Sequence, residues 1–109
     1  MALGIVHLAV MARAEPIGEI VLKKISQEEK YCTMGIALKN DSWKGHGYGT
    51  AAEKLAIDYA FQNMGMKTVF AYALLNNTKS QHVLEKVGFQ EIYTDTIFRY
   101  YRYDKGRRN

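Results

Sequence analysis

The stretch SWKGHGYGT, residues 42–50, places three glycines at alternate positions directly before a segment with helical spacing. Glycine loses more backbone entropy on folding than any other residue, so this density of glycine requires a structural reason. A glycine-rich loop that enters a helix leaves several backbone N–H groups unpaired, and the helix dipole adds partial positive charge there. Because Gly45, Gly47 and Gly49 carry no side chain, an anion can approach the backbone closely. The stretch therefore predicts an anion site, and a pyrophosphate suits it.

Two nucleotide-binding motifs and a purely structural turn compete with this interpretation. GHGYGT lacks the closing Gly-Lys-Ser/Thr of a P-loop. GYGTAA matches Gly-x-Gly-x-x-Ala, the fingerprint of a dinucleotide site. That site requires the motif to follow its strand directly and a carboxylate to follow the next strand. Here residues 39–44 separate the motif from the preceding strand, and the next strand is followed by no carboxylate. A structural turn would not explain the positive charge of Lys39, Lys44 and His46 around the glycines. An anion site at a helix N-terminus fits best.

The apolar pattern on both sides of the glycines predicts six strands and two helices. We expect strands over 4–11, 17–25, 31–38, 67–75, 89–95 and 96–104, and helices over 51–64 and 78–87. Asn77 can cap the second helix and Gly88 can end it, while Gly65 can stop the first. The run KTVFAYALL, residues 67–75, is typical of a strand buried on both faces. The turn between the last two strands is expected near residues 94–96, but it has neither Gly nor Pro, so its exact boundary is left open.

This element order contains one strand–helix–strand crossover among antiparallel neighbours. It predicts an α+β fold with a mixed, mostly antiparallel sheet, one parallel strand pair that can splay, and helices on its faces. The glycine stretch follows the first strand of that crossover, where two splayed strands can admit a ligand. With 109 residues we expect a single domain over 1–109.

Composition and charge narrow the function classes. The lone Cys32 has no disulfide partner and is expected to be a small buried hydrophobe in a reducing, cytoplasmic compartment. The apolar N-terminal stretch is too short to cross a bilayer, and no metal site is expected. The net charge is +4, and the region 99–108 alternates Arg with Tyr. This region indicates either nucleic-acid binding or a charged edge strand with a solvated tail, and we favour the second.

Two segments resemble motifs of a known family. KGHGYG, residues 44–49, resembles the acetyl-CoA motif Q/R-x-x-G-x-G/A of the GNAT superfamily of N-acetyltransferases, with Lys44 in place of Gln or Arg. NTKSQHVLEKVGF, residues 77–89, resembles the family segment N-x-x-S-x-x-x-Y/L-x-K-x-G-F. The resemblance runs from about residue 17 to residue 103. Within the family, the sequence is similar to the ribosomal-protein N-terminal acetyltransferase branch. It implies a truncated acyl-CoA N-acyltransferase fold.

The resemblance also implies a binding site for acetyl-CoA, the acetyl donor substrate. The glycine loop would hold the pyrophosphate, and the pantetheine arm would pair with the strand before it. One N–H there, of Ile36 or Ala37, would stabilise the oxyanion. The cofactor-binding residues implied are Ile36, Ala37, Leu38, Lys44, Gly45, His46, Gly47, Tyr48, Gly49, Thr50, Asn77, Ser80 and Lys86.

The sequence departs from the family pattern at the acid and base positions. Many relatives carry Glu where Thr33 stands and use Tyr as the acid where Leu84 stands. Attack on the thioester requires a neutral amine, so a base or a relayed water is needed. The catalytic residues are therefore left unassigned, with four side chains available in principle: His7, Glu19, Glu91 and Tyr93.

The family begins with a strand and two helices that have no counterpart in the pattern of this chain, which predicts an N-terminally shortened domain. Without them one sheet face would expose apolar surface, so we expect a homodimer or other oligomer. The first functional hypothesis is an acetyl-CoA-dependent N-acetyltransferase acting on an amine, either a protein N-terminus or a small molecule. The alternatives are a non-catalytic coenzyme A-binding or interaction module and, third, a small basic nucleic-acid-binding domain.

Overall fold

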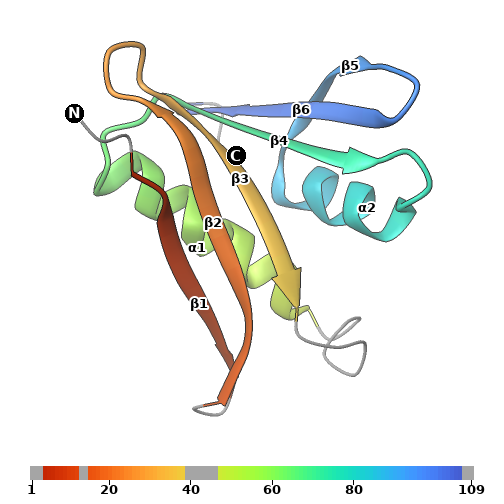
Figure 1. The fold of residues 1–109 in the computed structure, drawn as a ribbon, viewed down its shortest axis with the longest axis horizontal. Helices are drawn as coiled ribbons and strands as arrows, with labels where there is room; N and C mark the ends of the chain where they lie inside the picture. Colours follow the sequence, from red (N-terminus) through yellow and green to blue (C-terminus); the bar gives the residue numbers. More distant parts are fainter. Residues whose placement is uncertain (1–3, 13–14, 39–46, 107–109) are drawn as a thin grey trace.

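The computed structural model describes residues 4–12, 15–38 and 47–106. These residues form one sheet of six strands in the order β1-β2-β3-β4-β6-β5 (Figure 1). Adjacent strands in the sheet are antiparallel except for β3 and β4, which are parallel. The expected α+β fold class is therefore confirmed. The strands are β1 (Val6–Ala12), β2 (Glu15–Ser26), β3 (Tyr31–Leu38), β4 (Thr68–Leu74), β5 (Gln90–Thr94) and β6 (Phe98–Asp104), and the helices are α1 (Tyr48–Gln62) and α2 (Thr78–Val87).

The parallel pair is short, and its strands part toward their C-terminal ends. Tyr31–Met34 of β3 pairs with Thr68–Ala71 of β4. Beyond Met34 the two strands diverge, as Figure 1 shows, while β3 runs on to Leu38 and β4 to Leu74. The splayed pair expected from the element order is therefore present.

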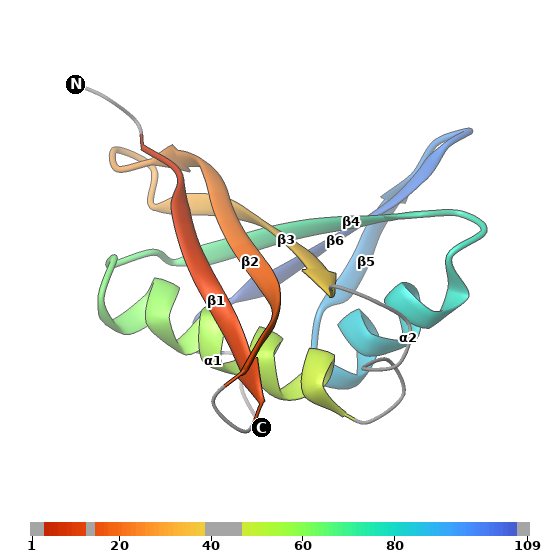
Figure 2. The same ribbon diagram turned by 60° about the horizontal axis from the view of Figure 1, so that its bottom comes forward.

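Both helices pack against the same face of the sheet (Figure 2). Cys32 and Met34 of β3 and Val69 and Ala71 of β4 are buried on this face. Burial raises the pKa of the Cys32 thiol to about 11, which fits its expected role as a small hydrophobe. The buried residues that α1 contributes are Glu53, Ala56, Ile57, Ala60 and Phe61. Among the described residues, no helix combines the length and apolar character needed to cross a membrane.

Helix α1 begins at Tyr48, three residues earlier than the apolar spacing indicated. Gly47 precedes it with φ +82°, a left-handed conformation that glycine adopts without a steric penalty. The N–H of Ala51 donates to the carbonyl of Gly47 at 3.1 Å, so helical bonding starts within the glycine stretch itself. Gly47 and Gly49 therefore form the N-cap and the first turn of the helix rather than a loop that ends before it.

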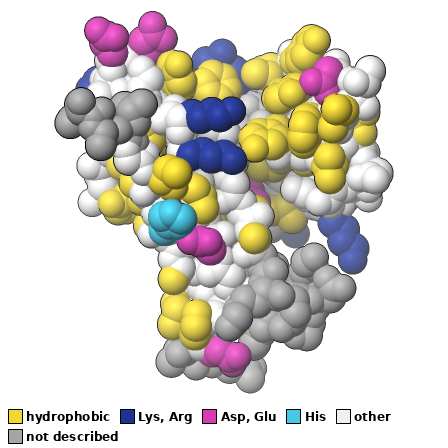
Figure 3. All heavy atoms as spheres, in the orientation of Figure 1, with side chains coloured by type: hydrophobic (Ala, Val, Ile, Leu, Met, Phe, Trp, Pro, Cys, Tyr) yellow, Lys and Arg dark blue, Asp and Glu magenta, His cyan; other side chains and the backbone are white. Residues whose placement is uncertain are grey.

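The other face of the sheet is not covered by α1 or α2, and we call it the open face. Along β4 the side chains alternate: Val69 and Ala71 are buried against the helices, whereas Phe70 and Tyr72 are half-buried on the open face. The expectation that both faces of this strand are buried was therefore wrong. Its second face is covered mainly by neighbouring aromatic side chains, which leave it half-buried. Figure 3 shows hydrophobic side chains gathered over β4 and β6, beside Lys and Arg side chains.

The turn between β5 and β6 is held by a carboxylate. Asp95 accepts hydrogen bonds from the N–H of Ile97 at 2.8 Å and of Phe98 at 2.7 Å, and from the Tyr100 hydroxyl at 2.8 Å. These bonds, led by the one from Phe98, lower the pKa of Asp95. The turn lies between Thr94 and Phe98, close to its expected position. A short polar side chain organises it without glycine or proline, which explains why its exact boundary could not be predicted.

Candidate functional site

A groove of about 520 Å³ lies on the helix-covered face, where the end of β3 meets the N-terminal parts of α1 and α2. Strand β3 supplies an edge that is free of β4, and the two helices supply the walls. The lining residues are Ile36, Ala37, Gly47, Gly49, Thr50, Glu53, Asn77, Lys79, Ser80, His82, Val83 and Lys86.

Most of the described residues that the resemblance implied are brought together here. Those that line the groove are Ile36, Ala37, Gly47, Gly49, Thr50, Asn77, Ser80 and Lys86. Tyr48 instead packs against the hydrophobic core as the first residue of α1, and Leu38 ends β3. The predicted positions Lys44, Gly45 and His46 lie outside the described residues.

The N-terminus of α1 has the features of an anion site. Because the first intrahelical bond found there is donated by Ala51, the N–H groups of residues 48–50 precede the hydrogen-bonded part of the helix. No acidic side chain stands in this first turn. A Cβ built on Gly47 or Gly49 would meet none of the described residues within 4 Å, so this part of the chain leaves room beside the backbone. The helix dipole adds partial positive charge at the same point.

The N-terminus of α2 is fixed against the end of β4. The Asn77 side chain accepts from the N–H of Ser80 at 3.1 Å, which confirms Asn77 as the N-cap. The buried Gln81 amide donates to the carbonyls of Leu74 at 2.8 Å and Leu75 at 3.0 Å. Its oxygen accepts from Arg99 of β6 at 3.2 Å. The α2 wall of the groove is therefore held in register with β4 and β6.

Sequence reasoning missed four lining residues. Lys79, His82 and Val83 lie on the face of α2 that also carries Lys86, and the helical spacing of 79, 82, 83 and 86 is the signal that could have found them. The two lysines make this wall positively charged, which favours a phosphate-bearing ligand.

The fourth missed residue is Glu53 of α1. The residue is 1% exposed, and its Oε1 atom has no hydrogen-bond partner in the part of the chain that the structure describes. Burial raises the pKa of the Glu53 carboxyl to about 8. The residue follows Gly49 by four positions, so helical spacing places both on one face of α1. An acidic residue in an otherwise apolar helical stripe was the available signal.

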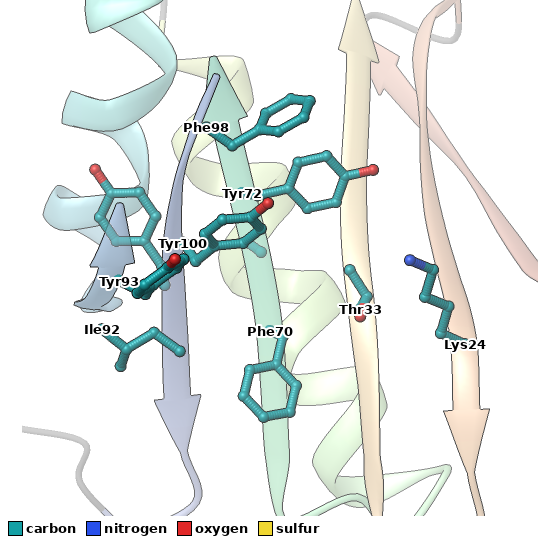
Figure 4. Close-up of a pocket in the computed structure, with 10 residues that line it drawn as sticks. Lys24, Thr33, Phe70, Tyr72, Ile92, Tyr93, Phe98 and Tyr100 are labelled. Atoms are coloured by element: carbon teal, nitrogen blue, oxygen red, sulfur yellow. The ribbon is translucent and has the colours of Figure 1, made fainter. Parts of the chain in front are cut away.

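A second hollow, of about 500 Å³, lies on the open face (Figure 4). Its wall is mainly aromatic, with the Tyr72 and Phe98 rings 5.1 Å apart and the Tyr93 and Tyr100 rings 5.7 Å apart. Lys23 donates to the Tyr72 hydroxyl at 3.1 Å. The lining residues are Lys24, Thr33, Phe70, Ala71, Tyr72, Ile92, Tyr93, Phe98, Tyr100 and Tyr101. We call this hollow the aromatic pocket.

The positions of the family acid and base hold no titratable group here. Thr33 lines the aromatic pocket and is 9% exposed, whereas Leu84 is 3% exposed and belongs to the core. Of the other candidates, Tyr93 lines the aromatic pocket with its side chain largely exposed. The exposed His7 and Glu19 are hydrogen-bonded to each other across β1 and β2.

Glu91 lies outside both hollows. It accepts from the Thr94 hydroxyl at 2.9 Å and pairs with Arg99 at 3.7 Å, so its interactions stay within the β5–β6 hairpin and its turn.

The alternating arginines of β6 are engaged within the fold. Arg99 donates to Gln81, and Arg102 binds Asp104 with a shortest contact of 2.8 Å. Arg102 also lies over the Phe70 ring at 5.5 Å. These contacts favour the interpretation of this region as a charged strand over that of a nucleic-acid surface.

Comparison with known proteins agrees with this geometry. Residues 2–90 match the acetyltransferase (GNAT) domain family, and the chain belongs to that family. Among curated proteins, the uncharacterized N-acetyltransferase YoaA of Bacillus subtilis strain 168 is 25% identical over 92 residues. That alignment covers 84% of this chain and 50% of YoaA, so the chain spans about half the length of this relative.

Solved structures share the fold. A probable acetyltransferase superposes with a TM-score of 0.85 at 25% identity, covering 94% of this chain and 63% of that one. The Campylobacter jejuni N-acetyltransferase PseH, solved in complex with acetyl coenzyme A, superposes with a TM-score of 0.81 at 25% identity. That match covers 92% of this chain and 67% of PseH.

Proposed function

We propose that this chain binds acetyl-CoA in the groove between β3, α1 and α2 and transfers the acetyl group to an amine. The observation that carries the proposal is the joining, in one groove, of a free strand edge, an open glycine-rich helix N-terminus and a cationic helix wall. The strand edge suits the amides of a pantetheine arm, whereas the helix N-terminus and the cationic wall suit a pyrophosphate. The acetyl coenzyme A complex of the related PseH supports the same ligand class.

The two hollows define a route for the transfer. The groove reaches the parting strands through Ile36 and Ala37 on the helix side, and the aromatic pocket reaches them through Thr33 and Tyr72 on the open side. We propose that the thioester lies at this parting and that the amine approaches from the aromatic pocket. The amine nitrogen bonds to the carbonyl carbon, the C–S bond breaks, and coenzyme A leaves as the thiol after the amine proton is transferred. A main-chain N–H of β3 stabilises the oxyanion.

Binding is tested with Gly47→Glu, which places bulk and negative charge where the pyrophosphate is proposed to lie. Gly65→Glu is the matched control, because Gly65 also has a positive φ, +74° against +82°, and is remote from the groove lining. Isothermal titration with acetyl-CoA should show binding to the wild type and to Gly65→Glu and none to Gly47→Glu, with similar melting temperatures for the two variants. Normal binding by Gly47→Glu would show that the pyrophosphate lies elsewhere.

A second candidate is a non-catalytic coenzyme A-binding module. The observation in its favour is that Thr33 and Leu84 supply no acid or base at the positions where many relatives have them. Thiol release from acetyl-CoA, measured with a panel of amine peptides and small amines, distinguishes the two functions. Release with N-terminal peptides would also support the proposed kinship with the ribosomal-protein N-terminal acetyltransferase branch. Tight binding without release would favour the module.

Assembly and cellular location stay predictions. The exposed apolar side chains on the β5–β6 hairpin, Ile92, Tyr93 and Ile97, support the proposed homodimer or other oligomer. Light scattering at micromolar concentration tests it, and a monomer would contradict it. The cytoplasmic location and the single domain over residues 1–109 are likewise proposals that rest on the sequence.

A further inference from the structure

Glu53 is a buried acid that the proposed mechanism does not use. It lines the groove on the α1 side, is 1% exposed, and has an Oε1 atom that finds no hydrogen-bond partner among the described residues. A buried polar atom without a hydrogen bond destabilises the fold. An apolar residue would avoid this cost, since the neighbouring buried positions Ala56 and Ile57 are apolar. The unpaired oxygen therefore points to a ligand that supplies the missing partner.

We propose that Glu53 contacts the cofactor, its protonated carboxyl donating a hydrogen bond to an amide carbonyl or hydroxyl oxygen of the pantetheine arm. This inference rests on the proposed function. The helical rise places Glu53 about 6 Å further along α1 than Gly49, beyond the N-terminus where the pyrophosphate is proposed to bind. The same groove is lined by Ile36 of β3, whose edge the pantetheine arm is proposed to follow.

The charge state of Glu53 fits a donor to a neutral part of the ligand. An ionised carboxylate is only an acceptor, whereas the protonated form supplies one O–H donor. Burial favours the protonated form at neutral pH. Among the described residues, the other titratable groups that line the groove are Lys79, His82 and Lys86 of α2, and β3 supplies none. Ionised Glu53 would also repel the phosphates of the ligand. Deprotonation should therefore weaken binding both by removing the O–H donor and by adding this repulsion.

The test compares acetyl-CoA binding by wild type, Glu53→Gln and Glu53→Leu over a pH series by isothermal titration. Glutamine keeps a neutral hydrogen-bond donor of the same shape, and leucine removes the donor without leaving a charge. If binding requires the protonated carboxyl, the wild-type Kd rises by as much as about 30-fold from pH 7 to pH 9.5, relative to Glu53→Gln. At pH 7 Glu53→Leu should bind about tenfold more weakly than wild type. Thermal melts check that both variants are folded.

The outcomes separate this inference from the proposed function. Overlapping pH profiles for wild type and Glu53→Gln, or wild-type affinity in Glu53→Leu at pH 7, would overturn the role of Glu53 while leaving the groove as the binding site. A wild-type protein that fails to bind acetyl-CoA at any pH would overturn the proposed function and this inference together. The expected result is a Kd for acetyl-CoA that rises with pH in the wild type relative to Glu53→Gln, together with weaker binding by Glu53→Leu at pH 7.

Discussion

Replacing Glu53 with glutamine should change how stability depends on pH in the ligand-free protein. Burial raises the pKa of the Glu53 carboxyl from an ordinary 4.5 to about 8. Between these values the folded protein holds a proton that the unfolded chain releases, so the free energy of unfolding falls as pH rises. The slope is about 1.4 kcal/mol per pH unit within this window and vanishes below and above it. From pH 5 to pH 7 the loss amounts to about 2 to 3 kcal/mol.

Urea denaturation followed by circular dichroism, at constant ionic strength and at pH 5, 6, 7 and 8, measures this loss. Glu53→Gln abolishes the titration, so its stability relative to wild type should increase by about 2 to 3 kcal/mol between pH 5 and pH 7. The matched control is Glu28→Gln, a change at an exposed residue in the β2–β3 turn, whose curve should run parallel to that of wild type. Parallel curves for wild type and Glu53→Gln would refute the reasoning.

Two further substitutions test how α2 is held. Gly88→Ala should destabilise the protein by about 2 to 4 kcal/mol, because φ is +124° and the new Cβ would lie 2.9 Å from the Tyr103 ring. The control is Gly65→Ala, where φ is +74° and no described residue lies within 4 Å of the new Cβ. It should lower the free energy of unfolding by only about 1 kcal/mol in the same urea titration. Asn77→Ala removes the acceptor for the Ser80 N–H and should cost about 1 kcal/mol. Asn77→Asp should keep the stability but weaken acetyl-CoA binding, because it adds negative charge to the groove; equal stability losses in the two Asn77 variants would contradict the cap.

Local patterns predicted the elements with strong boundary signals. The second helix runs from Thr78 to Val87 as expected, because Asn77 caps it and Gly88 ends it, and β3 also has its expected bounds. These features depend on neighbours within a few residues. The parallel pairing of β3 and β4 followed from the crossover between them.

Features that depend on tertiary contacts could not be predicted in the same way. The insertion of β6 between β4 and β5 depends on which edge β4 leaves free. The half-burial of Tyr72 depends on the aromatic residues Phe98 and Tyr100 of β6, and that of Phe70 depends on Tyr31 of β3 and Arg102 of β6, rather than on the apolar run itself. Within the candidate site, the two motifs indicated most of the groove, whereas Glu53 was missed because helical spacing alone does not show what a polar residue faces.

The hydrogen bonds of Gln81 have a mechanical consequence. They fasten α2 to the end of β4 and to Arg99 of β6, so one groove wall is tied to the β4–β6 part of the sheet. The opposite wall belongs to β3 and α1. Between these walls, β3 and β4 share a ladder of four residues at Tyr31–Met34. Beyond it, no sheet ladder among the described residues joins the two strands, so the width of the parting is set by side-chain packing, including that of α1 on α2.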